Sequence, residues 1–517
     1  MRPLDSTFSS LLHATLCACL ATAAAPVLAR QGEPPYSLLH PSKLAVTVPI
    51  EEVGAIDAAQ RRIDADASTR SLASPTKRLP VADGIRVAIS ADRNGRWQLL
   101  PDGSRLWRVR VRAAGATDLR LGFAQVALPP AATLHMIGAG DYYQGPYTAA
   151  DAESGSFHSS VVPGDMVTIE LHIPAGTTLR PDALELTSVG AGFRDVFGRA
   201  KAVTDTGPGT SGACNVNVVC PLGQPYPAEI RAVAYYEFQD DDDAQFYVCS
   251  GTLLNDVPQD RKPYLLTAAH CISSAAEASS MVVYWNYQST QCSVSSPPAG
   301  GYFNDDQHGT VLRATRDDAD FTLVQLTQAP DASWQVYYAG WDASGTTPAA
   351  TVGIHHPSGD VKKITAGPRP TTTDNCIGSG GASRNTHWET GPYAQGTTEG
   401  GSSGSGLFTV AGNGGGHDQL LIGTLSGRLR GVQPRRSRPA EWRHGLLRKI
   451  CGRVERRERI VAFARLAGSG EYRRGSAAGS RQSGDAAFAA WPLEASQAGG
   501  DSSAARLARI VPAAVEL

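Results

Sequence analysis

Three short stretches decide how this sequence is interpreted: LLTAAHC (265–271), DADFTLVQL (318–326) and GGSSGSGLF (400–408). They present a His at the end of an apolar run, an Asp before an apolar run and a Ser in a loop dense in Gly. A hydroxyl nucleophile needs a base to take its proton, and the base needs a carboxylate that fixes its tautomer. The stretches supply one of each, in the order His270, Asp320 and Ser403.

Each stretch alone is also typical of ordinary structure. A His often ends a strand, an Asp often occupies a turn, and a Gly/Ser loop is often only a loop. Their joint occurrence, in order, favours chemistry over structure. The Gly residues around Ser403 also allow backbone N–H groups to point at a developing oxyanion.

Short apolar segments separated by turn residues surround the three stretches. They occupy 229–238, 264–270, 281–288, 310–315, 320–326, 405–410 and 419–427. Regularly spaced short strands with few helical periods predict a β-sandwich or β-barrel.

The first part of the chain differs in composition, because residues 30–208 hold no Cys. Its strand-like segments are RLWRVRVRAA (105–114), DLRLGFAQVAL (118–128) and DMVTIELHI (165–173). These predict a small β-rich domain that fits a propeptide. A Gly/Thr/Pro linker at 203–212 indicates its boundary.

The chain begins with a sequence typical of export. Arg2 precedes an apolar run, and Val27-Leu28-Ala29 fits a signal-peptidase site, so residues 1–29 are predicted to be a secretory signal. An uncleaved membrane anchor or a lipid-anchored Cys is the alternative for this run. We expect a secreted bacterial protein, extracellular or periplasmic, in which disulfides can persist.

Composition narrows the function class further. The 517 residues carry a formal charge of −2 with 19% charged residues, which argues against nucleic-acid binding along the chain. No second segment is apolar and long enough to span a bilayer. Of nine Cys, seven follow the signal and none has the C-x-x-C spacing of a zinc site.

These motifs resemble the chymotrypsin-type serine proteases and, within them, the bacterial lysyl endopeptidase family. The matching blocks are T-A-A-H-C, D-F-T-L, G-S-S-G-S, CNVNVVCP (214–221), AGWD (339–342), GIHHPSGDVKKI (353–364) and, in the propeptide, GRWQLLPDGSRLWRVRVR (95–112). The resemblance implies an all-β, chymotrypsin-like double six-stranded β-barrel in 209–427, preceded by the propeptide in 30–208.

The resemblance also implies a function: a secreted endopeptidase that hydrolyses peptide bonds after Lys, or Lys and Arg, and is made as a zymogen. His270 would be the general base, Asp320 its orienting carboxylate and Ser403 the nucleophile. The N–H groups of Gly401 and Ser403 would form the oxyanion hole. We expect no cofactor and no metal, and a monomer whose partners are protein or peptide substrates and its own propeptide, with no nucleic acid or membrane partner.

The family pattern further implies the disulfides Cys220–Cys292 and Cys249–Cys271. Cys214 would pair with a Cys after Gly427, but the next is Cys451.

Activation is expected to differ from that of animal trypsins. The residue before the nucleophile is Ser402 rather than the Asp that pairs with the new amino terminus there. The pattern suggests a mature start near Gly209, although Pro208 is a poor cut site for a basic-specific protease. Arg199 and Lys201 are alternative first cuts.

The tail, residues 428–517, departs from the family. It is rich in Arg and lacks the expected pocket strand with its Asp, so we expect the last part of the second barrel to be disrupted and its edge open. Permitted codons for HGLLRKIC (444–451), read one base later, give Thr-Asp-Tyr-Tyr-Gly-Arg-Phe, which is that strand. The hypothesis is a frameshift in the gene or its sequencing; the alternative is a genuine basic arm. We expect an assembled triad with little peptidase activity.

Other interpretations remain open. A protease-like barrel can serve as a non-catalytic binding or adhesion protein. A metal-dependent hydrolase would use His355, His356 and His308, although adjacent His on a strand face opposite ways. Glu399 is an alternative acidic reader of a basic substrate residue, with a structural role in the Gly loop favoured. The run Asp240–Asp243 could bind calcium but is typical of a solvated loop.

Overall fold

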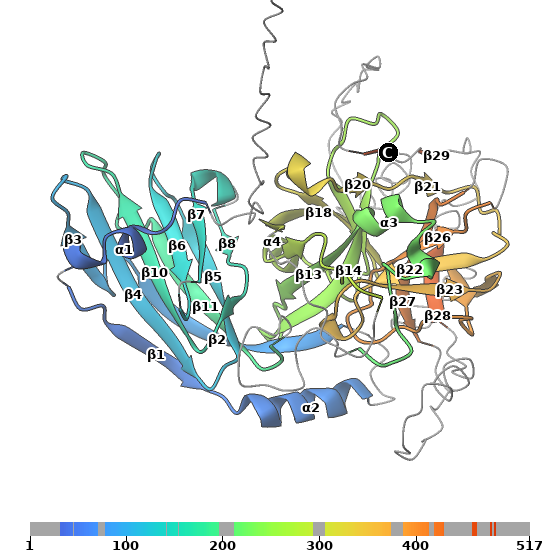
Figure 1. The fold of residues 1–517 in the computed structure, drawn as a ribbon, viewed down its shortest axis with the longest axis horizontal. Helices are drawn as coiled ribbons and strands as arrows, with labels where there is room; N and C mark the ends of the chain where they lie inside the picture. Colours follow the sequence, from blue (N-terminus) through green and yellow to red (C-terminus); the bar gives the residue numbers. More distant parts are fainter. Residues whose placement is uncertain are drawn as a thin grey trace, which may run out of the picture.

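A computed structural model describes residues 32–44, 46–70, 78–140, 142–152, 155–195, 211–292, 305–373, 386–412 and 418–428, and the backbone of 458–462, 476–477 and 480–481. The signal at 1–29, the candidate cuts near 199–209 and most of the linker and tail lie outside these residues. The described chain forms two β-rich halves, which Figure 1 shows side by side.

The N-terminal domain is built from two facing sheets. The first contains β1 (Ile50–Ala55), β3 (Arg96–Leu99), β4 (Arg105–Ala114), β6 (Thr133–Ile137), β7 (Tyr143–Tyr147) and β10 (Met166–Ile173). The second contains β2 (Leu79–Ser90), β5 (Asp118–Val126), β8 (Phe157–His158), β9 (Val162–Pro163) and β11 (Leu184–Gly192). The alternating apolar side chains of β4, β5, β10 and β11 meet in one core. The three strands predicted here from sequence are confirmed as β4, β5 and β10.

The C-terminal domain begins with a sheet that curls towards a barrel. Its strands are β13 (Val233–Gln239), β14 (Phe246–Leu254), β15 (Tyr264–Thr267), β16 (Val282–Tyr284), β17 (Asp306–His308), β18 (Thr310–Arg316) and β19 (Phe321–Leu326). The strand expected over 281–288 ends at Tyr284, and the one expected over 229–238 starts only at Val233, because α3 (Pro227–Ala232) precedes it. Pro227 at the first helical position favours that start.

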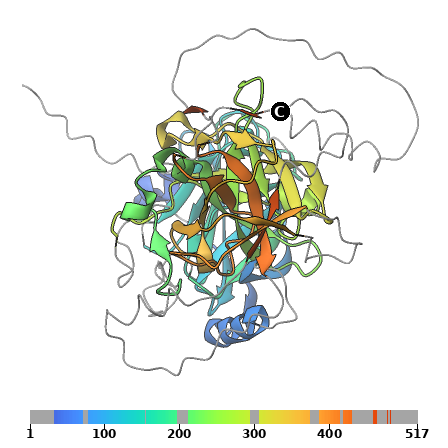
Figure 2. The ribbon, with the colours of Figure 1, turned by 90° about the vertical axis from the view of Figure 1, so that its right-hand side faces the viewer.

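A second sheet completes the C-terminal domain, which faces the viewer in Figure 2. It holds β12 (Val216–Asn217), β21 (Trp341–Asp342), β22 (Thr351–His355), β23 (Lys363–Gly367), β24 (Thr371–Thr373), β25 (His387–Thr390), β26 (Gly406–Thr409), β27 (Leu421–Arg428), β28 (Glu458–Ala462) and β29 (Ser476–Ala477). A separate pair joins β20 (Tyr337–Tyr338) to β30 (Ser480–Arg481). The fold is thus all-β with a chymotrypsin-like pair of barrels after a smaller β domain, as expected.

The tail differs from the open edge that the sequence led us to expect. Strand β28 pairs antiparallel with β27 on one side and β25 on the other. The segment ERIVA carries β-branched residues, and any such segment can satisfy the unpaired N–H and C=O groups of an edge strand.

Helices are few and short. They are α1 (Tyr36–Leu39), α2 (Ala58–Arg70), α3, α4 (Ala275–Ser279) and the 3₁₀ turns η1 (Pro41–Lys43), η2 (Ala149–Ala152), η3 (Pro221–Gly223), η4 (Ala332–Trp334) and η5 (Pro357–Gly359). Among the described residues, no helix is long and apolar enough to cross a membrane.

The two domains share one sheet. In Figure 1 the long blue strand β2 leaves the N-terminal domain and reaches β14 of the C-terminal domain. There it pairs antiparallel with β14, Leu79 opposite Val248 and Ala82 opposite Phe246. A buried apolar cluster forms at this junction, with Leu79 and Val81 against Tyr235 and Tyr284. Main-chain pairing and a common core therefore fix the N-terminal domain on the barrel.

Candidate active site

The two sheets of the C-terminal domain each contribute to one site. His270 follows β15 and Asp320 immediately precedes β19, and these two strands pair with each other. Ser403 lies just before β26 of the other sheet. The site is therefore assembled where the two sheets meet.

The three predicted side chains form a continuous hydrogen-bonded chain. The His270 Nδ1 atom lies 2.8 Å from Asp320 Oδ2 and 3.0 Å from Oδ1. The His270 Nε2 atom lies 2.7 Å from Ser403 Oγ. Because the carboxylate can only accept, the Nδ1–H donates to Asp320 and Nε2 accepts from the hydroxyl. This is the geometry required for a base to activate a serine.

Asp320 is held from three directions. Its Oδ1 atom accepts the backbone N–H of His270 at 2.9 Å, and its Oδ2 atom accepts the hydroxyl of Ser426, on β27, at 2.5 Å. The residue has a φ of 51°, a left-handed conformation that Asp tolerates better than most residues. Its side chain is 2% exposed, so the carboxylate orientation is fixed by protein groups rather than by water.

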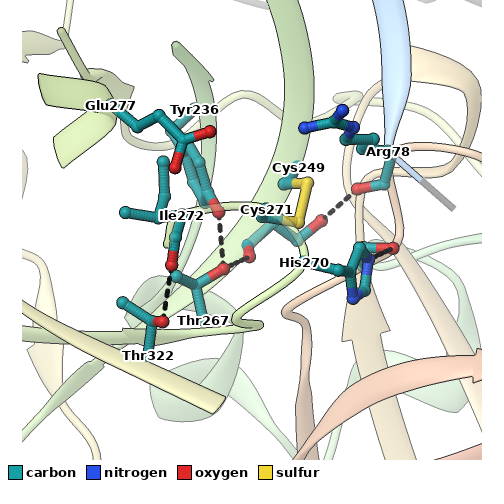
Figure 3. Close-up of a disulfide and its surroundings, with 12 residues drawn as sticks. Arg78, Tyr236, Cys249, Thr267, His270, Cys271, Ile272, Glu277 and Thr322 are labelled. Carbon is teal, nitrogen blue, oxygen red and sulfur yellow. Dashed lines mark hydrogen bonds between the residues drawn. A yellow bond between two sulfur atoms is a disulfide. The ribbon is translucent and has the colours of Figure 1, made fainter. Parts of the chain in front are cut away.

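A disulfide anchors the base. Cys249 of β14 and Cys271 are joined, so the residue after His270 is tied to the neighbouring strand, as Figure 3 shows. Below it, Tyr236 and Thr267 are linked by a 2.5 Å hydrogen bond, and Thr322 donates to the Ile272 carbonyl at 2.6 Å. Covalent and polar contacts thus restrain the loop that carries the imidazole.

The second expected disulfide, Cys220–Cys292, is also present in the structure. Cys214 is disulfide-bonded as well. Cys376 and Cys451 lie outside the described residues.

Glycines shape the loop around Ser403. Gly401 and Gly404 have φ values of 88° and 79°, which L side chains rarely adopt. A Cβ at Gly404 would lie 2.3 Å from the Ser250 carbonyl oxygen. Ser250, on β14, holds the loop by donating its N–H to the Ser403 carbonyl at 2.8 Å and its hydroxyl to the Gly401 carbonyl at 2.9 Å.

Ser402, which precedes Ser403, makes two hydrogen-bond contacts through its hydroxyl. Its Oγ atom lies 2.8 Å from His355 Nδ1 and accepts the Glu399 N–H at 3.1 Å. Ser402 and His355 are both buried. The loop before Ser403 is therefore tied to β22 by this contact.

Glu399 has a structural position. Its carboxylate accepts the Gly212 N–H and the Asn215 amide, each at 2.9 Å, and the Ser358 hydroxyl at 2.5 Å. These contacts tie the start of the C-terminal domain to the loop, which agrees with the structural role favoured from sequence.

The histidines considered for a metal are engaged elsewhere. The His308 Nδ1 atom contacts the His158 carbonyl at 2.7 Å, whereas His355 contacts Ser402. His356 Nδ1 lies 3.0 Å from the Asp360 carbonyl, and burial holds the pKa of its imidazole well below the usual value. Among the described residues, only Asp240, Asp241 and Asp242 bring three candidate ligand atoms within 4.8 Å of one another. The three His are not brought together as a ligand group among the described residues.

Sequence reasoning missed three supporting residues: Ser250, Ser426 and the His355 contact to Ser402. Ser426 sits in L-S-G and Ser250 follows Cys249, so both lay near recognised motifs. No local pattern identifies the contacts of Ser250 and Ser426, because their partners lie more than a hundred positions away in the sequence.

Both domains of this chain are similar in sequence to known proteins. Residues 208–431 match the lysyl endopeptidase C-terminal domain and residues 54–189 match the lysyl endopeptidase N-terminal domain. A lysyl endopeptidase of Pseudomonas aeruginosa is 34% identical over 345 residues, which covers 62% of this chain and 68% of that protein.

Solved structures are more distant. The Rv3671c protease of M. tuberculosis, active form, is 12% identical with a TM-score of 0.30, covering 47% of this chain and 80% of that one. The MamO protease domain of Magnetospirillum magneticum is 11% identical with a TM-score of 0.28, covering 46% and 94%. The sequence matches span both domains, and on their strength this chain belongs to the lysyl endopeptidase family.

Proposed function

We propose that the chain is the precursor of a secreted serine endopeptidase that acts through an acyl-enzyme and is built to cleave after Lys, or Lys and Arg. The observation that carries the proposal is the uninterrupted contact from Asp320 through His270 to Ser403, with a distance of 2.7 Å at the nucleophile. The two family matches on either side of the linker support a propeptide followed by a protease.

The geometry supports a defined sequence of proton transfers. Ser403 Oγ attacks the substrate carbonyl carbon while His270 Nε2 takes its proton, and Asp320 stabilises the imidazolium. His270 then gives the proton to the leaving amine, which breaks the peptide bond and leaves an ester on Ser403. Water, activated by the same imidazole, hydrolyses the ester and restores the hydroxyl.

The N–H groups of Gly401 and Ser403 are proposed to stabilise the oxyanion. Within the part of the chain that the structure describes, no acceptor is hydrogen-bonded to either group. The positive φ of Gly401 sets the turn that carries them. Donors fixed in advance of the reaction lower its barrier without reorganisation.

The proposal also covers the selectivity of this chain for Lys substrates and its activation from a zymogen. The sequence after Gly427 lacks the family's pocket Asp, and Glu399 is committed to Gly212, Asn215 and Ser358. We therefore propose that the triad is competent while turnover of Lys substrates by this chain is low. The N-terminal domain, which shares a sheet with the barrel, is proposed to act as the propeptide of a zymogen.

The test combines labelling with turnover, using the full chain. A fluorescent phosphonate should label wild type at Ser403 but not Ser403→Ala, and absence of labelling in folded wild type would contradict the protease proposal in favour of a binding protein. Rapid, Lys-selective hydrolysis of a Lys ester would contradict the proposed effect of the tail. Sequencing the DNA for 427–463 tests the frameshift directly.

A further inference from the structure

Strand β2 approaches the candidate active site in a defined direction. Along β14, residue numbers rise from Phe246 towards Ser250, whose N–H donates to the Ser403 carbonyl at 2.8 Å. Because β2 is antiparallel, its residue numbers fall towards Ser403, from Ala82 opposite Phe246 to Leu79 opposite Val248. A peptide bound in this way leads with its amino-terminal end towards the nucleophile, as the leaving-group segment of a substrate must.

The register then fixes which position meets the nucleophile. Continuing the pairing by one residue brings Arg78 opposite Cys249, beside the disulfide that anchors the residue after His270. Figure 3 shows Arg78, Cys249 and His270 grouped there. The preceding position of a bound peptide falls opposite Ser250, at the level of Ser403. Arg78 therefore occupies the place of the first residue after a scissile bond.

The side chain of Arg78 contacts a carboxylate and an aromatic ring of the C-terminal domain. Its guanidinium Nη1 lies 2.5 Å from Asp240 Oδ2, and its Cζ lies 4.2 Å from the centre of the Tyr247 ring. Tyr247 is fixed in turn by donating its hydroxyl to Asp243 at 2.7 Å. A carboxylate beside an aromatic face is a combination that recognises a cationic side chain.

Asp240 is oriented by its own loop. Its Oδ1 atom accepts the N–H groups of Asp242 and Asp243, each at 3.0 Å, and its side chain is 4% exposed. Burial would raise the pKa of this carboxyl, but the Asp243 N–H and Arg78 outweigh it and the pKa is lowered. The ionised form of the Asp240 carboxyl is thus favoured, and one of its oxygens points at the guanidinium of Arg78.

We propose that the β14 edge at Phe246–Val248, together with Asp240 and Tyr247, is the leaving-group subsite of the protease and binds a basic residue directly after the scissile bond. In this chain β2 occupies the edge and Arg78 occupies the basic position. Extended peptides commonly bind enzymes by adding a strand to such an edge. This inference rests on the proposed endopeptidase function and extends it to the residue that follows the cleaved bond.

Substrate preference provides the first test. Because Arg78 fills the basic position in wild type, full-chain Arg78→Ala, Arg78→Ala/Asp240→Asn and Arg78→Ala/Asp242→Asn are compared on matched quenched peptides with Lys before the cut and Arg, Ala or Glu after it. We expect Arg78→Ala and its Asp242→Asn derivative to prefer Arg over Ala about tenfold in kcat/KM, as one charge-assisted hydrogen bond would give, and the Asp240→Asn derivative to lose the preference. Equal rates for the Arg and Ala peptides in Arg78→Ala would overturn the proposal.

A second experiment tests whether Arg78 occupies the subsite, and it needs no enzymatic turnover. It measures hydrogen exchange of the backbone amides in residues 79–82 and 246–248. We expect Arg78→Ala and Asp240→Asn each to speed exchange about tenfold, the double variant to add nothing, and Arg78→Lys to retain most protection. The exposed pair partner Arg180→Ala is the control. Unchanged exchange would overturn the assignment of Arg78.

The failures of the two proposals are distinguishable. Wild type that neither reacts with the phosphonate nor cleaves any peptide contradicts the endopeptidase function, and with it the subsite that rests on that function. Labelled, active protein with no preference for Arg, but with coupled exchange effects, shows that Asp240 only anchors the N-terminal domain.

Discussion

Arg120 and Glu237, which belong to different domains, form a buried bidentate ion pair. The Arg120 Nη2 atom lies 3.0 Å from Glu237 Oε1, while its Nε donates to Oε2 and its Nη1 to Asp118. Tyr235 donates its hydroxyl to the same Glu237 Oε1 at 2.8 Å. Because these groups are removed from water, removing one partner leaves an uncompensated charge.

Arg120→Ala is therefore expected to destabilise the full chain by about 3–5 kcal/mol, the usual effect of breaking a buried pair. Urea unfolding followed by tryptophan fluorescence gives the change. The matched control is Arg180→Ala, whose exposed pair with Asp182 should contribute close to nothing. A loss in Arg120→Ala no larger than in the control would contradict the prediction.

Ser426→Ala should slow phosphonate labelling of Ser403 about tenfold. The Ser426 hydroxyl is one of the donors that fix the Asp320 carboxylate, and hydrogen bonds to charged groups contribute about 1.5–3 kcal/mol. The rate of labelling, measured by gel fluorescence at several phosphonate concentrations, checks this. Ser279→Ala, an exposed serine, is the control, and equal rates in both variants would count against a role for Ser426.

Ser402→Ala should both destabilise the chain and slow labelling. It leaves the buried His355 Nδ1 without its 2.8 Å partner, which costs about 1–3 kcal/mol, and it loosens the turn that carries Ser403. Thermal unfolding and labelling rate are measured together. Ser402→Thr retains the hydroxyl and should restore much of both; a variant with normal stability and normal labelling would show that the contact is dispensable.

Acidification should weaken the contact between the domains through His158. This residue lies on β8 with Nε2 3.5 Å from Gln239 Oε1, and its carbonyl contacts His308. Burial first, and the nearby His308, lower the pKa of His158 from 6.5 to about 4. Since the unfolded chain binds the proton more readily, this group's contribution to stability is present above pH 6.5 and is lost as the pH falls towards 4.

His158→Gln should remove that contribution. Urea midpoints of wild type and variant are compared at pH 7 and at pH 4.5, and the gap between pH values should be smaller in the variant. If both proteins lose the same stability on acidification, His158 is not responsible.

The candidate site shows how far sequence reasoning reaches. His270, Asp320 and Ser403 could be selected because each has a distinctive local sequence and their order matched a known family. The strands were predictable from short apolar runs, and β4 and β19 begin and end close to the predicted limits. Local patterns also misled at Glu229–Ala232, where Pro227 starts a helix instead of a strand.

The sequence by itself therefore determined the family of this protein, its all-β class and its two family-matched domains, because these depend on local composition and motif. Only the tertiary structure decided which groups support the site. Three contacts between separate segments are examples. They are the hydrogen bond from Ser426 to Asp320, the contact of His355 with Ser402 and the ion pair of Arg78 with Asp240. Such contacts depend on how sheets pack and in which register strands pair, and no local pattern encodes either.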